Sequence, residues 1–320
     1  MRSLFLCRAT LVLLLSVTLA VAAANSSRRW FKRAYSDASQ SFINDTLLQC
    51  QDYALVMKAF VRPYGSDAAI TTFSWHPGPS TAACPDLNAS FSPTIWGRGT
   101  LLPPLNATIM PSTATVKWNS VLGFWNPNMN LSEPTAKLTP YEAAELWPQI
   151  VALAQQHGDE NTIIVSPAMN PCSGDSCYPD VETGEPVAWL NYTLSNCSAM
   201  NPGEPDKCRM DAIAVNHYGN CTASDLESFI NSFSNFHKPI WVTEFACHWW
   251  PQQNDTDTIA YLKETLPMLE NHPAVQRYFY FVGRAPGFNT TQLFQGTGNN
   301  VSLTAVGELY FGYPANFSEN

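Results

Sequence analysis

The stretch that decides the fold is DAIAVNHYGNCTASDLESFINSFSNFHKPIWVTEFAC, residues 211–247. It begins with a short run of mainly apolar residues, 212–218, and ends with a second such run, 240–245. Between these runs, apolar side chains recur at helical spacing over residues 222–233. A strand, a helix and a strand in this order form a βαβ unit, whose two strands lie parallel in one sheet. The stretch therefore predicts an α/β fold.

The same alternation continues in both directions along the chain. One helix is predicted from Thr139 to Gly158, where a capping box and a proline open the first turn, and another from Thr256 to about Glu270. The other short apolar runs are candidate strands, one near 33–35 and the rest at 69–75, 91–96, 120–124, 162–166 and 278–282. The sequence has no glycine-rich phosphate loop of the kind that an open nucleotide-binding sheet uses. We therefore predict a single (β/α)8 barrel of the TIM type over residues 32–313.

The first 24 residues have the layout of a secretory signal peptide. Two arginines precede or flank the start of an apolar run at 11–21, and small residues fill positions 22–24. We expect cleavage after residue 24, a polar leader at 25–31 and a short tail at 314–320. The apolar run is too short for a membrane helix, and the tail lacks the hydrophobic segment of a glycolipid anchor. The sequence therefore predicts a secreted protein.

Cysteines and sequons indicate the same compartment. Of nine cysteines, Cys7 leaves with the signal peptide, and the remaining eight are an even number, as expected for four disulfides. Eight cysteines allow 105 connectivities, and we expect the local one: Cys172–Cys177, Cys197–Cys208, Cys221–Cys247 and Cys50–Cys84. N-x-S/T sequons begin at residues 25, 44, 88, 106, 130, 191, 196, 220, 254, 289, 300 and 316. They predict a surface covered by N-linked glycans.

The charge balance excludes one class of partner. The 320 residues include 17 Lys and Arg against 26 Asp and Glu, which gives a formal net charge of −9. Proteins that bind DNA or RNA need clustered Lys and Arg opposite the phosphates. We therefore expect no nucleic-acid partner. We also expect a monomer without a cofactor. A metal site is not expected either, because no cysteine pair has the C-x2-C spacing of a zinc site.

In a β/α barrel the active face is built from the carboxyl ends of the strands and the loops that follow. The residues predicted there are mostly aromatic or amide side chains: Trp75, Trp96, Trp125, Asn126, Asn216, His217, Tyr218, Glu244, Trp249 and Tyr280. Aromatic rings stack on the C–H faces of sugars, and amides bind sugar hydroxyls. The pattern predicts a carbohydrate cleft. Glu244 is the candidate reactive carboxylate, and its simpler interpretation is a solvated group at a strand end.

The residues around Glu244 carry a family resemblance. Five segments are similar to glycoside hydrolase family 128, the group related to the fungal alkali-sensitive linkage protein: VLGFWNPN at 121–128, YEAAELWP at 141–148, DAIAVNHYG at 211–219, KPIWVTEFAC at 238–247 and LTAVGELY at 303–310. The resemblance extends from about Lys32 to Tyr310 and is most specific at 239–246. It implies a β/α barrel that acts on β-1,3-glucans, as a retaining endo-β-1,3-glucanase or a protein derived from one.

The resemblance also assigns the catalytic positions. Glu244 holds the nucleophile position at the end of strand 7, and a retaining mechanism needs a second carboxyl roughly 5 Å away. The family segment Gly-Phe-Asn-Glu-Pro after strand 4 reads GFWNP at 123–127, so Asn126 replaces the acid/base glutamate and Trp125 the preceding asparagine. On strand 6 the family segment Val-His-Trp-Tyr-Gly reads VNHYG at 215–219. A carboxamide cannot protonate a leaving alkoxide, and general-acid catalysis contributes roughly 10²–10⁴-fold in rate.

Three functions stay open after this substitution. In the first, the protein is an enzyme in which Glu133 or His217 supplies the proton; their simpler interpretations are a solvated loop residue and a hydrogen-bonded wall residue. In the second, it is an inactive glycosidase that binds β-glucan, in the cell wall or as a lectin. In the third, it neither binds nor cleaves sugar.

Overall fold

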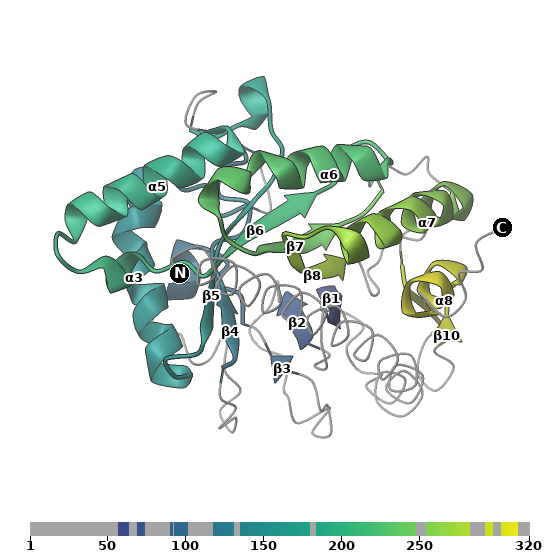
Figure 1. Cartoon of the computed structure of the whole chain (residues 1–320), viewed down its shortest axis with the longest axis horizontal. Helices are drawn as coiled ribbons and strands as arrows, with labels where there is room; N and C mark the ends of the chain where they lie inside the picture. The colour runs from purple at the N-terminus through teal and green to yellow at the C-terminus, as the bar shows by residue number, and fades with distance from the viewer. Residues whose placement is uncertain are drawn as a thin grey trace, which may run out of the picture.

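The computed structural model describes residues 57–63, 69–73, 90–91, 93–101, 118–130, 135–179, 184–247, 254–281, 292–296 and 302–312. In this part of the chain, strands and helices alternate along most of the sequence, and helices cover one large sheet (Figure 1). The α/β class predicted from the sequence is confirmed.

Among the described residues, the large sheet contains eight strands in the order β3-β2-β1-β8-β7-β6-β5-β4. Their bounds are Met57–Pro63 (β1), Ala69–Phe73 (β2), Ser90–Phe91 (β3), Ser120–Leu122 (β4), Ile163–Met169 (β5), Ala212–His217 (β6), Ile240–Phe245 (β7) and Val275–Tyr280 (β8). Two short strands, Phe294–Gln295 (β9) and Ser302–Leu303 (β10), pair with each other in a second sheet. Neighbours from β4 to β8 are all parallel, and these strands form half of the predicted barrel.

Strand β1 departs from the predicted all-parallel arrangement. It pairs antiparallel with both of its neighbours, β2 and β8. Only residues 64–68 join β1 to β2, and a parallel crossover needs a dozen or more residues, so this short connection forces an antiparallel pair. The strand predicted near 33–35 lies outside the described residues. The prediction of an all-parallel barrel is therefore corrected at β1.

A short segment forms β3 at one edge of the sheet and also contacts β4, the strand at the other edge. Ser90–Phe91 pairs with β2, and a few residues later Thr94 forms a parallel bridge with Leu122 of β4. Ile95 N–H donates to the Leu122 carbonyl at 2.9 Å, and Leu122 N–H donates to the Pro93 carbonyl at 2.8 Å. These are contacts of the kind that barrel closure requires, because one segment must pair on both sides.

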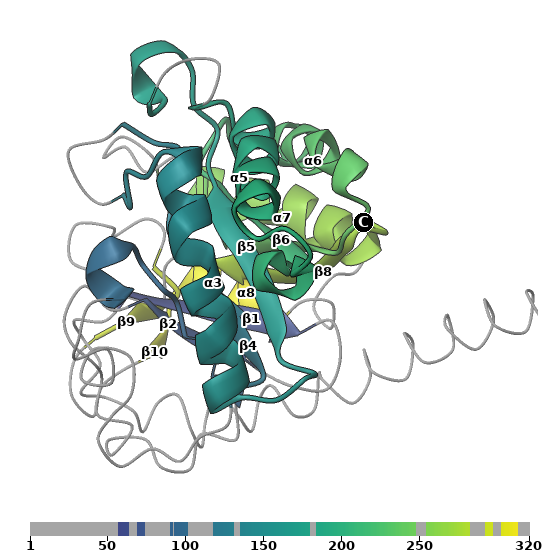
Figure 2. The ribbon, with the colours of Figure 1, turned by 90° about the vertical axis from the view of Figure 1, so that its left-hand side faces the viewer.

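In the part of the chain that the structure describes, α-helices lie along the sheet, as Figure 2 shows from the side. Their bounds are Pro140–His157 (α3), Pro186–Met200 (α5), Ala223–Ser232 (α6), Asp255–Asn271 (α7) and Ala305–Gly312 (α8). The predicted capping box of α3 is confirmed, since the Thr139 hydroxyl accepts from Glu142 N–H at 3.1 Å and Glu142 Oε2 accepts from Thr139 N–H at 2.9 Å. Helix α6 begins directly after Thr222, whose hydroxyl accepts from Asp225 N–H.

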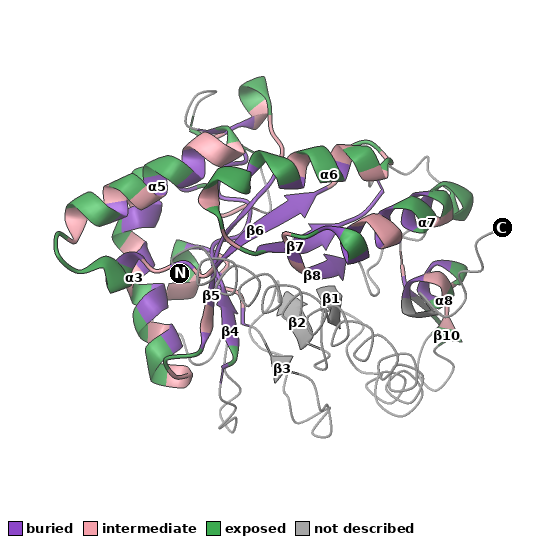
Figure 3. Cartoon of the chain, viewed as in Figure 1, coloured by how far each residue is buried: buried purple, intermediate pink, exposed green. Residues whose placement is uncertain are grey.

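The core lies on both faces of the sheet, and strands β6 and β7 are buried throughout (Figure 3). Between the sheet and the helices, large side chains such as Trp147, Trp189, Phe245 and Tyr278 are almost fully buried. On the other face, a smaller cluster consists of Leu122, Trp125, Val165, Ala168, Ala212, Ala214, Trp241 and Phe279. We call this second group the inner cluster. The site described below lies beside the inner cluster, at the carboxyl ends of the parallel strands.

The described residues form three disulfides: Cys172–Cys177, Cys197–Cys208 and Cys221–Cys247. These are three of the four predicted pairs, and Cys50 and Cys84 lie outside the described residues. Disulfides of this kind form in oxidising compartments. No helix in the described part of the chain has the length and apolar character to cross a bilayer.

Candidate active site

The Glu244 carboxyl group lies at the carboxyl end of β7 and is fully buried. The Trp125 indole N–H donates to its Oε1 at 3.0 Å, and the Tyr218 hydroxyl donates to its Oε2 in a short hydrogen bond. Trp125 follows β4 and Tyr218 follows β6, so three neighbouring regions of the sheet converge on one carboxyl group. Each carboxyl oxygen therefore already has a donor.

An irregularity in the strands aims Glu244 at the inner face. Residues three apart in a regular strand point to opposite faces. Trp241 nevertheless belongs to the inner cluster, and Glu244 contacts Trp125 of the same cluster. The pairing register of β7 shifts between Val215 and Asn216 on one side and between Val242 and Phe245 on the other. A bulge of this kind re-aims a side chain, as is common beside active sites.

Burial controls the protonation of this carboxyl group. Desolvation raises the pKa of Glu244 to about 8, although the hydrogen bonds from Tyr218 and Trp125 act in the opposite direction. Burial also raises the pKa of Tyr218 well above its usual value, and the nearby Glu244 charge adds to this effect. Glu244 therefore holds its proton more tightly than a free glutamate does. The ionised form that a nucleophile needs becomes more populated as the pH rises toward about 8.

Asn126, at the acid/base position, is buried and held by other amides. Its side-chain Oδ1 accepts from Asn216 Nδ2 at 3.0 Å and from Asn170 Nδ2 at 3.4 Å. Its backbone has φ of 43°, in the left-handed region, which asparagine tolerates better than most residues. Its N–H donates to the Ala168 carbonyl at 3.1 Å. Asn126 is thus fixed through both its backbone and its side chain.

Two indole rings lie beside Glu244 and Asn126. Trp96 stacks on Trp125 with ring centroids 4.3 Å apart and planes 21° from parallel. The backbone N–H of Trp125 donates to the backbone carbonyl of Trp96 at 3.0 Å, so the two segments are also joined through their backbones. The Phe281 ring meets Tyr218 edge-on at 5.4 Å. Aromatic surface next to fixed polar groups is the usual composition of a sugar site.

The structure brings together most of the predicted site residues that it describes: Trp96, Trp125, Asn126, Asn216, Tyr218 and Glu244. It places His217 and Tyr280 elsewhere. His217 Nε2 lies 3.2 Å from Asp225 Oδ2 at the start of α6, and Tyr280 packs against Phe245 in the helix-covered layer. Burial lowers the pKa of His217, and the Asp225 charge opposes this effect. His217 therefore has a partner in the outer layer, away from the partners of Glu244.

Strand alternation explains these two differences. Adjacent residues of a strand point to opposite faces, so an error of one residue at a strand end selects the wrong side chain. On β6 the inward residue is Asn216 and the outward residue is His217. Trp75, Trp249 and Glu133 lie outside the described residues, so their predicted roles stay predictions.

Three residues of the site were absent from the prediction: Asn170, Thr243 and Phe281. Asn170 was missed because β5 extends to Met169, three residues beyond the predicted end of that strand. The Thr243 hydroxyl donates to Asn216 Oδ1 at 2.6 Å, a contact that sequence spacing does not reveal. A polar residue directly after each strand is the signal that would have found Asn170.

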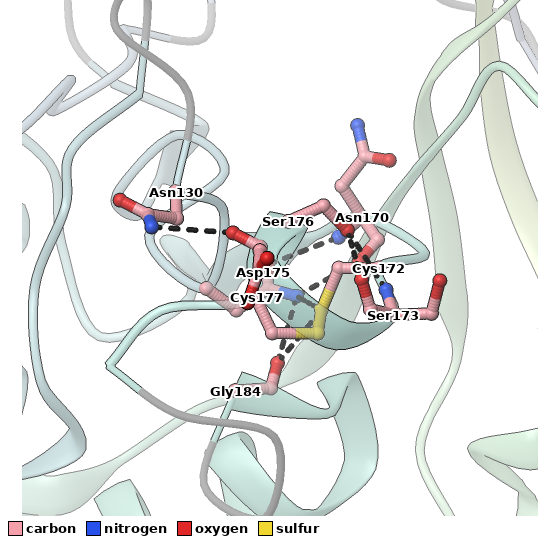
Figure 4. Close-up of a disulfide and its surroundings, with 9 residues drawn as sticks. Asn130, Asn170, Cys172, Ser173, Asp175, Ser176, Cys177 and Gly184 are labelled. Carbon is pink, nitrogen blue, oxygen red and sulfur yellow. Dashed lines mark hydrogen bonds between the residues drawn. A yellow bond between two sulfur atoms is a disulfide. The ribbon is translucent and has the colours of Figure 1, made fainter.

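The loop after β4 is tied to the disulfide loop after β5 (Figure 4). Asn130 N–H donates to the Ser176 carbonyl at 2.8 Å, and Asn130 Nδ2 donates to the Asp175 carbonyl at 3.2 Å. Deeper in the loop, Asn128 Nδ2 donates to the Asn170 carbonyl at 2.8 Å. The loop that carries Asn126 is therefore held in place by hydrogen bonds to the loop after β5. In the described part of the chain, no cluster of three or more His, Cys, Asp or Glu side chains could hold a metal.

The profile of the family described as "Glycosyl hydrolase catalytic core" matches residues 62–310. The chain belongs to this family. Among solved structures, the glycosyl hydrolase chain resembles the family 128 (subgroup II) endo-β-1,3-glucanase of Sorangium cellulosum, at 29% identity and a TM-score of 0.59. This match covers 75% of this chain and 89% of that one. The subgroup II endo-β-1,3-glucanase of Pseudomonas viridiflava matches at 26% identity and a TM-score of 0.55, over 75% of this chain and 88% of that one.

One curated relative is Alkali-sensitive linkage protein 1 of Schizosaccharomyces pombe, 37% identical over 132 residues. The match spans 38% of this glycosyl hydrolase chain and only 22% of the relative's length. The family resemblance inferred from the sequence is confirmed by these comparisons: the chain contains a glycosyl hydrolase domain like those of family 128.

Proposed function

We propose that the chain is a secreted, N-glycosylated β/α barrel that binds β-1,3-glucan at the carboxyl ends of its parallel strands and hydrolyses it poorly or not at all. Glu244 holds the nucleophile position, and Asn126 holds the position of the lost proton donor. The signal-like leader and the three disulfides support secretion, and the double pairing of residues 90–95 supports a closed barrel.

The observation that carries the proposal is the environment of Asn126. Its carboxamide accepts hydrogen bonds from Asn216 and Asn170, and both of these partners are amides rather than carboxyl groups. Hydrolysis of an unactivated glucan needs a proton on the leaving oxygen, and an amide does not supply one. Beside it, the stack of Trp96 and Trp125 offers the aromatic surface on which sugars bind.

A second candidate function is a retaining glucanase that uses another acid. Glu244 favours it, because a buried carboxyl group with two donors at a strand end is also the arrangement of a working nucleophile. His217 is a poor candidate for the acid, because it bonds Asp225 in the outer layer. Glu133 lies outside the described residues and stays a candidate.

The test uses glycosylated protein from a eukaryotic host and β-1,3-gluco-oligosaccharides. Heat of binding and release of reducing ends are followed in one sample, for the native chain, Glu244→Gln and Asn126→Glu. We expect the native chain to bind without forming product, and Asn126→Glu to cleave. In that variant the introduced carboxyl group protonates the glycosidic oxygen while the Glu244 carboxylate attacks the anomeric carbon, and water then releases the sugar.

Two results would contradict the proposal. Product from the native chain that disappears in Glu244→Gln would show an enzyme with another acid. Flat binding isotherms across linear and branched β-glucans would show a barrel that neither binds nor cleaves these sugars. Asn126→Glu is expected to lose on the order of 1 kcal/mol in stability, because glutamate adopts the left-handed backbone conformation less readily than asparagine does. Thermal melting of each variant checks that it is folded.

A further inference from the structure

A chain of hydrogen bonds fixes which way the Asn126 amide faces. The Thr243 hydroxyl lies 2.6 Å from Asn216 Oδ1 and 3.2 Å from the Val215 carbonyl, and donation along the shorter contact turns the Asn216 NH2 group the other way. That NH2 group lies 3.0 Å from the side chain of Asn126, and the NH2 group of Asn170 lies 3.4 Å from the same atom. Only an oxygen can accept from both. A flipped Asn126 would place its own NH2 group against two others and lose both bonds.

The Asn126 NH2 group is therefore the last donor in this series of hydrogen bonds. It points away from the two donating amides, and no acceptor among the described residues lies within hydrogen-bond distance of it. Asn126 as a whole is only 3% exposed, but its Nδ2 is not one of the fully buried polar atoms without a partner, so the group keeps some access to the surface. A ligand oxygen would supply the acceptor that this donor lacks.

The remaining polar atoms decide what kind of ligand atom fits. Both Glu244 oxygens already accept, from Trp125 and Tyr218, and the Asn126 oxygen already accepts twice. The free group beside the indole stack is thus a donor. Sugar hydroxyls can donate or accept, whereas the oxygen that bridges two sugars only accepts.

We infer that Asn126 Nδ2 donates a hydrogen bond to the bridging oxygen of a bound β-1,3-glucan, and that Asn216 and Asn170 are the residues that position it. The inference rests on the proposed glucan binding. It gives the substitution a role of its own: the position that would protonate the linkage instead holds the linkage intact. Asn170 contributes through its side chain alone, since its backbone N–H and carbonyl bond Asn128.

The test compares the native chain with Asn126→Asp, a variant of the same shape. Its carboxylate can still accept from Asn216 and Asn170, but its second oxygen presents an acceptor where the native chain presents a donor. We expect the affinity for a β-1,3-gluco-oligosaccharide to fall about 10- to 100-fold at pH 7. At lower pH the introduced group protonates and donates again, so the ratio of variant to native affinity should recover. Glu244 titrates in both proteins, so its effect on affinity largely cancels in that ratio.

Two further arms isolate the atoms involved. Asn161→Asp adds the same charge at the exposed turn before β5, at the opposite end of the sheet from Asn126, and should leave affinity unchanged. An oligosaccharide with sulfur in place of the bridging oxygen should bind the native chain more weakly, because sulfur is a weak acceptor. The same ligand should show little further loss with Asn126→Asp. Asn170→Ala should reduce affinity for the oxygen-linked sugar several-fold and affinity for the sulfur-linked sugar much less.

The outcomes separate the two proposals. If the native chain binds no β-glucan, the proposed function fails and this inference fails with it. If the native chain binds and Asn126→Asp keeps full affinity at pH 7, or if the sulfur-linked sugar binds the native chain as well as the oxygen-linked one, only the inference is overturned. The sulfur-linked sugar needs no variant, so this arm does not depend on how a substituted protein folds.

Discussion

The indole nitrogen of Trp125 lies 3.0 Å from Oε1 of Glu244, and it donates a hydrogen bond from the loop after β4 to the end of β7. The two residues are 119 positions apart in the sequence. The family segment that the sequence resembles has an asparagine at the position of Trp125. In this chain the one indole both donates to the carboxyl group and stacks on Trp96.

Trp125→Phe should separate these two contributions. Phenylalanine keeps an aromatic ring against Trp96 but has no N–H, so Glu244 loses a donor that stabilises its carboxylate. We expect the pKa of Glu244 to rise further above about 8, and stability to fall by on the order of 1 kcal/mol for the lost bond and more for the lost volume. Titration of the Glu244 carboxyl carbon by NMR measures the first effect. An unchanged or lower pKa would show that the indole does not interact with this group.

Glu244 should make stability fall as pH rises. Its pKa is about 8 in the folded chain against 4.5 for a free glutamate. Between these values the folded chain holds a proton that the unfolded chain has lost, so stability decreases from about pH 4.5 to about pH 8 and is level above that. The effect is on the order of a few kcal/mol for a fully buried group.

Glu244→Gln is the matched variant for this effect. Its amide oxygen can accept from Trp125 and its NH2 group can donate to Tyr218, but it does not titrate. The difference in unfolding free energy, native minus variant, should decline between pH 5 and pH 8 in urea titrations, because the other groups titrate in both proteins. A flat difference would mean that Glu244 is solvated in the folded chain.

The three disulfides should differ in what they contribute. Their separations in sequence are 5, 11 and 26 residues for Cys172–Cys177, Cys197–Cys208 and Cys221–Cys247. Loop-closure entropy then predicts losses of about 2, 3 and 3.5 kcal/mol when both cysteines of a pair become alanine. Chemical unfolding of the three double variants tests the order, and each variant is a control for the others. A larger loss for the shortest loop would show that this pair acts mainly through its contacts with the loop of Asn126.

Much of the fold could be predicted because local signals agree with the tertiary structure. The bounds of β7 match the prediction, and α3 begins at its predicted capping box, where Thr139 and Glu142 bond each other. Helix α5 was not predicted, since Glu185 at its start forms no side-chain cap and its apolar residues lack a clear helical period. The direction of β1 depends on the length of one connection, which a pattern of short apolar runs does not show.

The site was predictable to the level of residues but not of contacts. Family resemblance placed Glu244 and Asn126 at strand ends, and the structure brings these regions together. Which neighbour faces inward depends on bulges and on the true end of each strand, so His217 was chosen beside Asn216, and Asn170 was missed. The direction of the hydrogen bonds among these amides depends on the short contact of the Thr243 hydroxyl with Asn216 Oδ1, which only the three-dimensional structure reveals.

Asp225→Asn should show that His217 is a structural residue of the outer layer. His217 Nε2 lies 3.2 Å from Asp225 Oδ2, and its ring contacts Phe229 of α6 at 5.6 Å. Burial already lowers the pKa of His217, and removal of the Asp225 charge should lower it further, because that charge favours the protonated ring. NMR titration of the histidine rings measures this change. Glucan affinity should stay within about twofold of the native value, as expected for a pair in the outer layer, away from the ligand. A large loss of affinity, with the chain still folded, would place His217 in the cleft after all.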